Sequence, residues 1–493
     1  MSPTRVRRIH FVGIGGTGMS GLAEVLLRMD YQVSGSDLMR SEVTDRLSAM
    51  GAHISIGHAA GHVRGVDLLV VSSAVGRGNP EVSAARRLGL PTLRRGEMLA
   101  EIMRLHFGIA VAGSHGKTTT TSLAGHLLAC AGADPTVVVG GRLKMIGGNV
   151  RLGQGRYLVA EADESDGSFL DLSPTIAVVT NIDREHLDHY RDLPVIQKTF
   201  LEFMRKVPFY GLAIVCGDDP NVRAILPRMR KRIVTYGFGP DNHLRAIDLK
   251  TDGMAQDYGV AWQGVRLGRA RLSLPGRHNV QNALAALAIG LELGYDTDTC
   301  LRALGDFDGV GRRFEIRGET GGVVLLDDYG HHPTELAAVL ATARSVWDRR
   351  QVVVFQPHRY SRTRALAREF AEVLKDADVL VLADIYSAGE RPIAGVTSDL
   401  IMDGVRALNG REVIRVHGGD DAVTTISALL APGDLLMTLG AGDVSRWGNA
   451  ILQAYEQRAG AERQAGAHAP HGAASQAGAA GQPTAGPPAG KGF

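Results

Sequence analysis

The sequence predicts an α/β protein built from parallel sheets and crossover helices. Short apolar runs typical of buried strands alternate with helical patterns along almost the whole chain. Two glycine-rich loops each follow such a run and precede a helical pattern, as in βα units that hold phosphate. The 493 residues exceed what one hydrophobic core usually supports, so we expect two to four domains.

The expected elements follow from the alternation of apolar and polar residues. Strands are predicted at 8–13, 32–36, 68–72, 109–113, 157–161, 176–181, 323–327, 351–356, 379–383 and 435–440, and helices at 20–29, 120–129 and 280–293. Domain boundaries are expected near 103–108 and 308–318. The polar, strand-like segment 243–274 predicts an antiparallel edge or flap.

Composition narrows the class of protein. The chain is 44% hydrophobic and 22% charged with a net charge of +2, which gives no general surface for nucleic acid or membrane. Its three cysteines form no C-x-x-C pair, so neither a zinc nor a disulfide framework is expected. The basic N-terminus leads into no signal-peptide core, and no apolar run is long enough to span a bilayer. We therefore expect a cytoplasmic protein.

The first glycine-rich loop, Gly13-Ile14-Gly15-Gly16-Thr17-Gly18, fits G-x-G-x-x-G between a strand and a helix. Such glycines let the backbone approach a pyrophosphate at a helix N-terminus. Asp37 ends the next strand, where a carboxylate contacts a ribose or base. The pattern alone is equally typical of an NAD-dependent oxidoreductase or of a tight βα turn, but nothing downstream resembles a hydride-transfer site.

The second loop, Gly113-Ser114-His115-Gly116-Lys117-Thr118-Thr119, resembles a shortened phosphate-binding loop. Its backbone N–H groups would face a triphosphate, Lys117 would reach the β/γ-phosphates and Thr118 would hold Mg²⁺. A structural glycine turn is the alternative, and a nucleotide switch or nucleic-acid motor is disfavoured by the balanced charge and the short loop. One diphosphate loop and one triphosphate loop favour an enzyme that uses ATP on a nucleotide-linked substrate.

Acidic and histidine residues follow two further strands. Glu161 ends one strand and could share Mg²⁺ with Thr118, because Mg²⁺ prefers hard oxygen ligands; a solvated acidic loop is the alternative. His186 follows another strand of the expected sheet, where a second metal or phosphate contact competes with an ordinary surface histidine.

At this point the chain resembles the Mur ligase family, over about residues 8–456. The likeness is carried, in the family's order, by HFVGIGGTGMSGLAEVL (10–26), GSD (35–37), AGSHGKTTTT (112–121), VAEADESDGSF (159–169), TNIDREHLDHY (180–190), GRHNVQNALAA (276–286), VGRRFE (310–315), DDYGHHPTE (327–335), FQPHRYSRT (355–363) and TLGAGD (438–443).

The resemblance implies three domains and a tail. These are an N-terminal Rossmann-like UDP-binding domain (1–107), a central ATPase domain of the P-loop type with a parallel sheet (108–315), a C-terminal Rossmann-like amino-acid-binding domain (316–456) and a disordered Ala/Gly/Pro-rich tail (457–493). It also implies that ATP, with Mg²⁺ or Mn²⁺, activates the lactyl carboxylate of UDP-N-acetylmuramate as an acyl phosphate. L-Alanine then attacks, in peptidoglycan precursor synthesis, with the chain a monomer or weak homodimer.

Site residues carry over at matching positions. The resemblance assigns the UDP substrate to Gly15, Gly16, Thr17, Gly18, Met19, Ser20, Asp37 and Ser72. It assigns ATP to the loop Gly113, Ser114, His115, Gly116, Lys117, Thr118 and Thr119 and to His278, Asn279, Asn282, Arg312 and Asp328. It assigns the metal to Thr118, Glu161 and His186, and the amino acid to Tyr329, His331, His332, His358, Arg359 and Arg362.

Several points stay open within this likeness. His278, Asn279 and Asn282 could instead be polar caps of a helix, and the histidines of the amino-acid side could instead bind zinc. Arg312 would contact the γ-phosphate, and His332 is the candidate to deprotonate the alanine ammonium. Leu201 stands where relatives that add other amino acids carry a carbamylated lysine, which agrees with the alanine-adding branch. The alternative function within the family is that of the recycling ligase, which adds a tripeptide.

Overall fold

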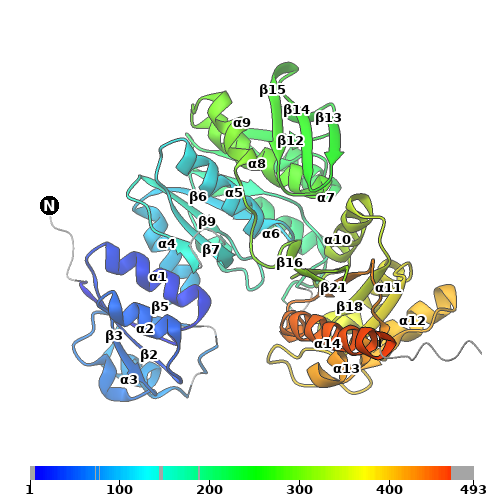
Figure 1. Cartoon of the computed structure of the whole chain (residues 1–493). Coiled ribbons are helices and arrows are strands. Elements are labelled where there is room, and N and C mark those ends of the chain that lie inside the picture. Colours follow the sequence, from blue (N-terminus) through cyan, green and yellow to red (C-terminus); the bar gives the residue numbers. More distant parts are fainter. Residues whose placement is uncertain (1–5, 73, 77, 144–147, 187–188, 468–493) are drawn as a thin grey trace, which may run out of the picture.

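The computed structural model describes residues 6–467 apart from 73, 77, 144–147 and 187–188. Its strands form three sheets that follow one another along the chain, and we call the parts built on them the N-terminal, middle and C-terminal units. Figure 1 shows the N-terminal unit in blue and the C-terminal unit in yellow to red on different sides of the middle unit. The predicted α/β class is confirmed.

The N-terminal unit is a parallel sheet in the order β3-β2-β1-β4-β5. Its strands are β1 (Arg8–Val12), β2 (Gln32–Asp37), β3 (His53–Ile56), β4 (Leu68–Val71) and β5 (Thr92–Arg94), and its helical segments are α1 (Thr17–Arg28), α2 (Glu42–Ala49), η1 (Ala60–Val63), α3 (Pro80–Leu88) and α4 (Arg95–Arg104). Successive side chains of a strand face opposite sides of a sheet. Phe11 therefore packs with α1, whereas Val12 packs with η1 and α3.

The middle unit contains a sheet in the order β15-β14-β13-β12-β11-β10-β6-β9-β7-β8. The strands are β6 (Phe107–Ala112), β7 (Thr136–Leu143), β8 (Gly148–Arg151), β9 (Tyr157–Glu161), β10 (Ile176–Val179), β11 (Leu212–Cys216), β12 (Ile233–Gly237), β13 (Leu244–Asp252), β14 (Ala255–Trp262) and β15 (Val265–Leu272). The segment predicted as an antiparallel edge forms β13–β15, which pair antiparallel at one end of the sheet.

Helices cover both faces of the middle sheet. They are α5 (Lys117–Cys130), α6 (Leu193–Arg205), α7 (Pro220–Ile225), α8 (Arg277–Glu292) and α9 (Thr297–Gly305). Ile109 and Val111 of β6 pack with α5 and α8, whereas Ala110 and Ala112 face the core that includes α6. Because β6 is buried on both faces, it reads in the sequence as a continuous apolar run.

The C-terminal unit is a sheet in the order β16-β17-β21-β18-β19-β20, in which only β16 pairs antiparallel among the described strands. Its strands are β16 (Glu315–Thr320), β17 (Val323–Asp328), β18 (Gln351–Phe355), β19 (Val379–Ala383), β20 (Ile414–Val416) and β21 (Leu435–Leu439), and its helices are α10 (Pro333–Val346), α11 (Tyr360–Leu374), α12 (Asp399–Asn409), α13 (Gly418–Leu429) and α14 (Trp447–Ala467). Leu326 packs toward α10–α12, and Leu325 packs toward α13 and α14.

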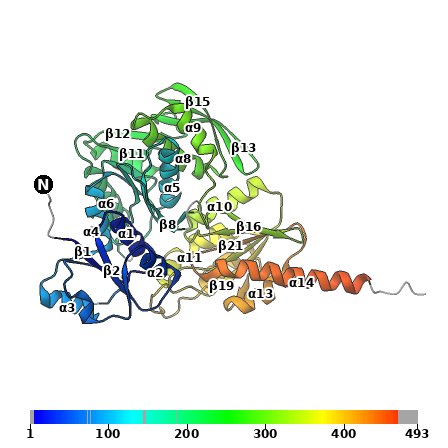
Figure 2. The same cartoon turned by 60° about the vertical axis from the view of Figure 1, so that its left-hand side comes forward.

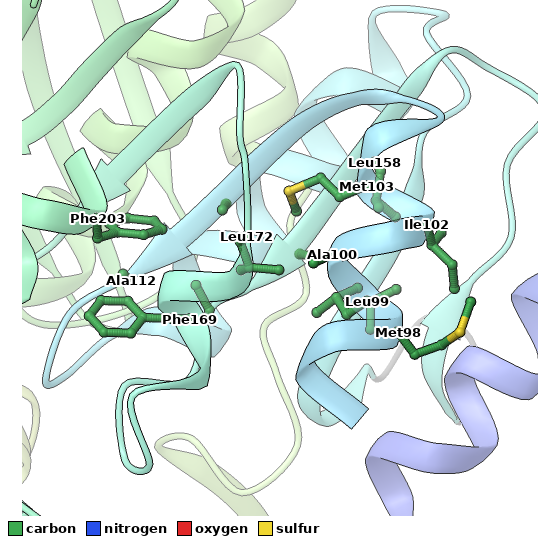
Figure 3. Packing of buried hydrophobic residues seen from close by; sticks show 14 of the residues in the cluster. Met98, Leu99, Ala100, Ile102, Met103, Ala112, Leu158, Phe169, Leu172 and Phe203 are labelled. Carbon is green, nitrogen blue, oxygen red and sulfur yellow. The ribbon is translucent and has the colours of Figure 1, made fainter. Parts of the chain in front are cut away.

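The N-terminal and middle units share one continuous core through α4. Met98, Leu99 and Ile102 of α4 belong to the same buried cluster as Phe169 and Phe203 of the middle unit. Figure 3 shows these side chains between α4 and the neighbouring segments. The rings of Phe169 and Phe203 stack with their centroids 5.0 Å apart. The first glycine-rich loop is therefore held against the middle unit by apolar packing.

Helix α14 corrects the predicted start of the tail at residue 457. The helix runs to Ala467, with its far end directed away from the C-terminal unit (Figure 2). Its first half buries Ile451, Leu452 and Tyr455. The helix then continues beyond the expected boundary. The remaining part of the predicted tail, 468–493, lies outside the described residues. None of the described helices combines the length and apolarity needed to cross a membrane.

Candidate active site

The first glycine-rich loop joins β1 to α1, as the motif predicts. Gly13 has a φ of 80°, which favours glycine, and a Cβ there would lie 3.2 Å from Cβ of Ser72. Gly15 donates its N–H to the Asp37 carboxylate at 2.8 Å. The buried Met19 and Ser20 lie in the first turns of α1, which Thr17 begins and Gly18 continues. Gly16, Asp37 and Ser72 therefore gather at the carboxyl edge of this sheet.

The second loop joins β6 to α5 and is closely packed. Gly113 has a φ of 140°, and a Cβ would lie 1.9 Å from Oγ1 of Thr180. Gly116 has a φ of 80°, and a Cβ would lie 2.5 Å from Oδ1 of Asn282. Thr180 also donates its hydroxyl to the carbonyl of His115 at 2.6 Å. The loop is thus held in place from β10 and α8, with glycine required at both ends.

The loop lysine faces inward, toward the carbonyls of its own loop and Glu164. Nζ of Lys117 donates to the carbonyls of Gly113 at 2.6 Å and Ser114 at 3.1 Å and to Glu164 at 2.8 Å. Burial alone would lower the pKa of Lys117, but Glu164 and the other carboxylates nearby outweigh it and raise the pKa. The ammonium is therefore charged and already positioned at the loop.

The expected metal residues fall into two groups. Thr118 donates its hydroxyl to both Glu161 oxygens, at 3.0 and 3.1 Å, so the two residues predicted to share Mg²⁺ lie in contact. Nε2 of His186 lies 3.5 Å from Glu164 and 3.8 Å from Glu185, so it belongs to a second group. The ligand atoms of Glu164, Glu185 and His186 lie within 4.8 Å of one another. Sequence reasoning missed Glu164 and Glu185, although both stand in the acidic runs after β9 and β10.

A cavity of about 350 Å³ lies between the second loop and the C-terminal unit. It is lined by His115, Gly116, Thr119, Thr180, Asn181, Ile182, Asp183, Asp219, Asn221, Tyr236, His278, Asn279, Gln281, Asn282, Arg313, Phe314, Asp328, Thr334, Glu335, Ala338 and Val339. The middle and C-terminal units also contact each other at its wall, where Thr334 donates its hydroxyl to Asp183 at 2.6 Å. The phosphate loop and α10 therefore line one cavity.

The residues predicted on the adenine side lie in this cavity. Asn282 accepts a hydrogen bond from Thr120 at 3.2 Å, and Asn279 donates to the carbonyl of Pro275 at 2.7 Å. The helix they belong to starts at the N-cap Gly276 without a side-chain cap, so helix capping does not account for these residues. Burial lowers the pKa of His278 to about 4, so its ring is neutral at pH 7.

Two carboxylates flank His115 in the loop. Its Nε2 lies 3.0 Å from Asp183 and its Nδ1 lies 3.4 Å from Glu335. Burial alone would lower the pKa of His115, but these two carboxylates outweigh it and raise the pKa to about 10. His115 is therefore an imidazolium that links the loop to β10 and α10.

His332 lies beside His115, with ring centroids 4.8 Å apart. It is the N-cap of α10, and its Nδ1 accepts the N–H of Thr334 at 3.4 Å. Burial and the positive charge of His115 lower the pKa of His332, so the ring is neutral at pH 7. Nδ1 also lies 3.6 Å from the Asp183 carboxylate, whereas Nε2 has no hydrogen-bond partner within the described part of the chain. The role of His332 as the base that deprotonates the alanine ammonium stays a prediction.

Arg312 and Arg313 occupy different positions, although the resemblance pointed to Arg312. Nε of Arg312 lies 3.1 Å from the buried Asp327, and its terminal nitrogen donates to the carbonyl of Gly440 at 2.6 Å. Arg313 lines the cavity, 3.6 Å from Glu335 and 5.1 Å from the ring centroid of Tyr329. The sequence shows only two adjacent arginines and does not indicate which one lines the cavity. Their packing in the structure distinguishes them.

The residues predicted for the amino acid surround Glu185 on the other side of the phosphate loop. Arg362 donates to Glu185 at 3.0 Å, and the His331 and His358 rings lie 5.4 Å apart. Burial lowers the pKa of His331 to about 4 and that of His358 to about 3. A smaller cavity of about 180 Å³ lies here, lined by Arg184, Glu185, His186, Arg359, Ser361, Arg362, Arg364, Ala365 and Leu366.

Two predicted residues mainly shape the backbone. Arg359 precedes α11 with a φ of 71° and donates its N–H to the carbonyl of Tyr386 at 2.8 Å. Asp328 accepts the N–H groups of Phe314 and Gly330, both at 2.6 Å. Burial raises the pKa of Asp328 to about 6. Tyr329 packs edge-on against His331, with centroids 5.4 Å apart.

This fold and site define a member of the Mur ligase family. Family models match the three units in order: "Mur ligase family, catalytic domain" at residues 8–107, "Mur ligase middle domain" at 111–290 and "Mur ligase, glutamate ligase domain" at 312–442. The chain therefore belongs to the Mur ligase family, and the resemblance found in the sequence is confirmed.

Individual relatives resemble the chain over most of its length. Proteins named UDP-N-acetylmuramate--L-alanine ligase are 53% identical in Geobacter sp. (strain M21), covering 91% of this chain and 97% of the relative, and 54% identical in Nitratidesulfovibrio vulgaris (strain DP4), covering 90% and 98%. The solved UDP-N-acetylmuramate-alanine ligase of Thermotoga maritima is 30% identical with a TM-score of 0.75, covering 92% of this chain and 99% of that one. A murein peptide ligase of Psychrobacter arcticus is 25% identical with a TM-score of 0.66, covering 91% and 99%.

Proposed function

We propose that this protein joins L-alanine to the lactyl carboxylate of UDP-N-acetylmuramate and converts ATP to ADP and phosphate. The observation that carries the proposal is the cavity in which the phosphate loop meets residues of the C-terminal unit, among them Arg313. A carboxylate activated there is shielded from water before an amine attacks it. The alanine ligases named above, at more than half identity over nine-tenths of the chain, support the same reaction.

ATP fits the cavity beside α5. Its phosphates would lie on the loop N–H groups at the helix N-terminus, where the partial positive charge favours anions. Ile182, Ala338 and Val339 form an apolar wall that suits the base, and Asn279 and Asn282 offer polar groups beside it. His115 adds a fixed positive charge to the loop.

The residues present fit Mg²⁺. Thr118 and Glu161 offer a hydroxyl and a carboxylate in contact, and Glu164, Glu185 and His186 offer a second group of ligand atoms. When bound, Mg²⁺ would neutralise charge that develops on the transferring phosphoryl group. Lys117 donates to the loop carbonyls and to Glu164, and from this position its ammonium would contact the phosphates of ATP.

The proposed reaction has two steps. A carboxylate oxygen of the lactyl group attacks the γ-phosphorus of ATP, the bond to the bridging oxygen breaks, and ADP leaves. The neutral amine of L-alanine then attacks the acyl carbon, and phosphate leaves from the tetrahedral intermediate. Lys117 and Arg313 would stabilise the charge on the phosphoryl group, so positioning and electrostatics supply most of the rate enhancement.

The acceptor would bind around Arg362 and Arg359. Guanidinium groups recognise a carboxylate through paired N–H donors. The cavity of about 180 Å³ beside them suits a short amino acid better than a tripeptide. His332, whose pKa burial lowers, would accept the proton that the alanine ammonium must lose before it attacks.

The test supplies the purified protein with Mg-ATP, UDP-N-acetylmuramate and one acceptor at a time, and measures phosphate release and the peptide product. L-Alanine should give phosphate release that depends on both substrates. A tripeptide in place of L-alanine should release about 10²-fold less phosphate. Preferred use of the tripeptide would assign the chain to the recycling branch, and no release with either acceptor would reject the ligase proposal.

We also propose that Arg313, not Arg312, faces the γ-phosphate. Arg313→Ala should lower phosphate release by about 10²-fold or more, since it removes a charge at the transferring group. Arg312→Ala should chiefly lower the stability of the C-terminal unit, because it leaves Asp327 buried without its partner. Steady-state kinetics and urea unfolding of both variants separate the roles. A folded Arg312→Ala variant without activity, beside an active Arg313→Ala variant, would reverse the assignment.

A further inference from the structure

A buried carboxylate in the N-terminal unit is surrounded by histidines and has no part in the proposed reaction. Glu81, at the start of α3, is completely buried. One of its oxygens, Oε2, accepts the Ser36 hydroxyl at 2.6 Å and lies 3.2 Å from Nδ1 of His58. Its other oxygen, Oε1, lies 2.5 Å from Nδ1 of His62. Burial alone would raise the pKa of Glu81, but the surrounding imidazole rings and the Ser36 hydroxyl outweigh it and lower the pKa to about 2.

A third imidazole completes this cluster without a hydrogen bond to it. The side chain of His10, on β1, is 2% exposed, and its Nε2 lies 3.7 Å from Oε1 of Glu81. Within the described residues, Nε2 has no hydrogen-bond partner. The alternation of β1 puts His10 on the same face as Val12, toward η1 and α3, and away from the Phe11 face that packs with α1.

The contact of the other ring nitrogen of His10 determines which forms of the ring can face Glu81. Nδ1 lies 2.9 Å from the Ser34 hydroxyl. If Nδ1 carries the proton, the lone pair of Nε2 faces the Glu81 carboxylate, and a cation between them relieves the repulsion. If Nε2 carries the proton, a donor is buried at a distance too long for a hydrogen bond. With the ring neutral, in either form, the space between the two atoms lacks a positively charged centre.

We propose that His10, His62 and Glu81 form a binding site for a divalent transition-metal ion of the zinc class. Nε2 of His10, Nδ1 of His62 and a Glu81 oxygen lie within 4.8 Å of one another. Zn²⁺ takes imidazole nitrogen and carboxylate oxygen at about 2.0–2.2 Å, so tetrahedral ligands stand about 3.3 Å apart. The His10–Glu81 separation would contract slightly, and the His62–Glu81 contact would open.

The surroundings fit such a site. Ser34 orients His10 through its Nδ1, and Ser36 and His58 hold the second oxygen of Glu81, which are the outer contacts that metal ligands usually have. The His62 side chain is 26% exposed, which gives the ion a path from solvent. Two histidines and one carboxylate leave a fourth position for water. The site is independent of the proposed ligase reaction.

The test uses the full-length protein after treatment with a chelator, and Zn²⁺ alone as the probe. Bound zinc is counted by elemental analysis after desalting, and the melting temperature is measured with and without zinc. His62→Ala removes one partly exposed ligand, and His53→Ala, an exposed histidine on β3, is the matched control. Wild type and His53→Ala should bind one equivalent more than His62→Ala and should gain thermal stability from it.

Co²⁺ in place of Zn²⁺ gives an independent readout, because four-coordinate Co²⁺ absorbs strongly in the visible range. This absorption should be present in wild type and missing in Glu81→Gln, which keeps the shape of the side chain. Circular dichroism checks that each variant is folded. Equal zinc content in folded wild type and His62→Ala would overturn the proposal and leave the cluster as a hydrogen-bonded network only.

Discussion

Lys117→Ala should abolish ADP formation, with a fall in rate of about 10³-fold or more. The buried ammonium is held at the phosphate loop by two carbonyls and by Glu164, so its removal takes away the charge that the transferring phosphate would meet. Coupled detection of ADP measures the effect. Binding of UDP-N-acetylmuramate, measured by calorimetry, should survive because the first glycine-rich loop belongs to another unit.

The matched control is Lys198→Ala on α6. Lys198 is exposed and pairs with Glu202 at 3.8 Å, so its removal changes the charge of the protein by the same amount without touching the loop. This variant should form ADP at the wild-type rate. If Lys117→Ala keeps more than a tenth of that rate, the loop does not bind the phosphates of ATP in the proposed way.

Glu185→Gln should lower both activity and stability. The carboxylate of Glu185 is largely buried between Arg362, His186 and His331, so the substitution leaves these groups without their negative partner. We expect phosphate release to fall about 10²-fold and the free energy of unfolding to fall by about 3 kcal/mol. Steady-state kinetics and urea unfolding measure the two effects, and Glu202→Gln, exposed on α6, is the matched control.

The pH dependence of stability tests the same residue. Burial alone would raise the pKa of Glu185, but His115, Arg362 and the nearby histidines outweigh it and lower the pKa from 4.5 to about 2. A carboxylate with a lowered pKa stabilises the fold above its unfolded pKa and loses that contribution as the pH falls through its folded pKa. The stability difference between wild type and Glu185→Gln should therefore shrink between pH 4.5 and 2. A constant difference over this range would show that the charge of Glu185 is not its cause.

The fold was predictable because its signals are local. The buried parallel strand β6 reads as an uninterrupted apolar run, and the polar alternation of 243–274 marks the antiparallel strands β13–β15. Each glycine-rich loop begins a helix where its motif requires one. The boundary at residue 457 failed because the chain continues, through Gly460 and Gly466, a helix that already packs on the sheet.

The candidate site was predictable only where its partners follow neighbouring strands of one sheet. The contact of Thr118 with Glu161 follows from neighbouring strand ends of a single sheet. The roles of Arg312 and Arg313 depend on which side of the chain faces Asp327, and the direction of His332 depends on where α10 begins. Residue type and spacing in the sequence indicate neither the positions of the two arginines nor the direction of His332.

By itself the sequence determined the class of protein, the order of its units and the loops that would hold two nucleotide groups, because hydrophobic period and glycine position act over a few residues. Only the tertiary structure decided which charges meet. Glu185 joins Arg362 to His331, His115 links Asp183 to Glu335, and Glu81 gathers three histidines, each across more than ten residues of sequence. A buried charge is stable only beside a partner. The packing of whole units determines which partners meet.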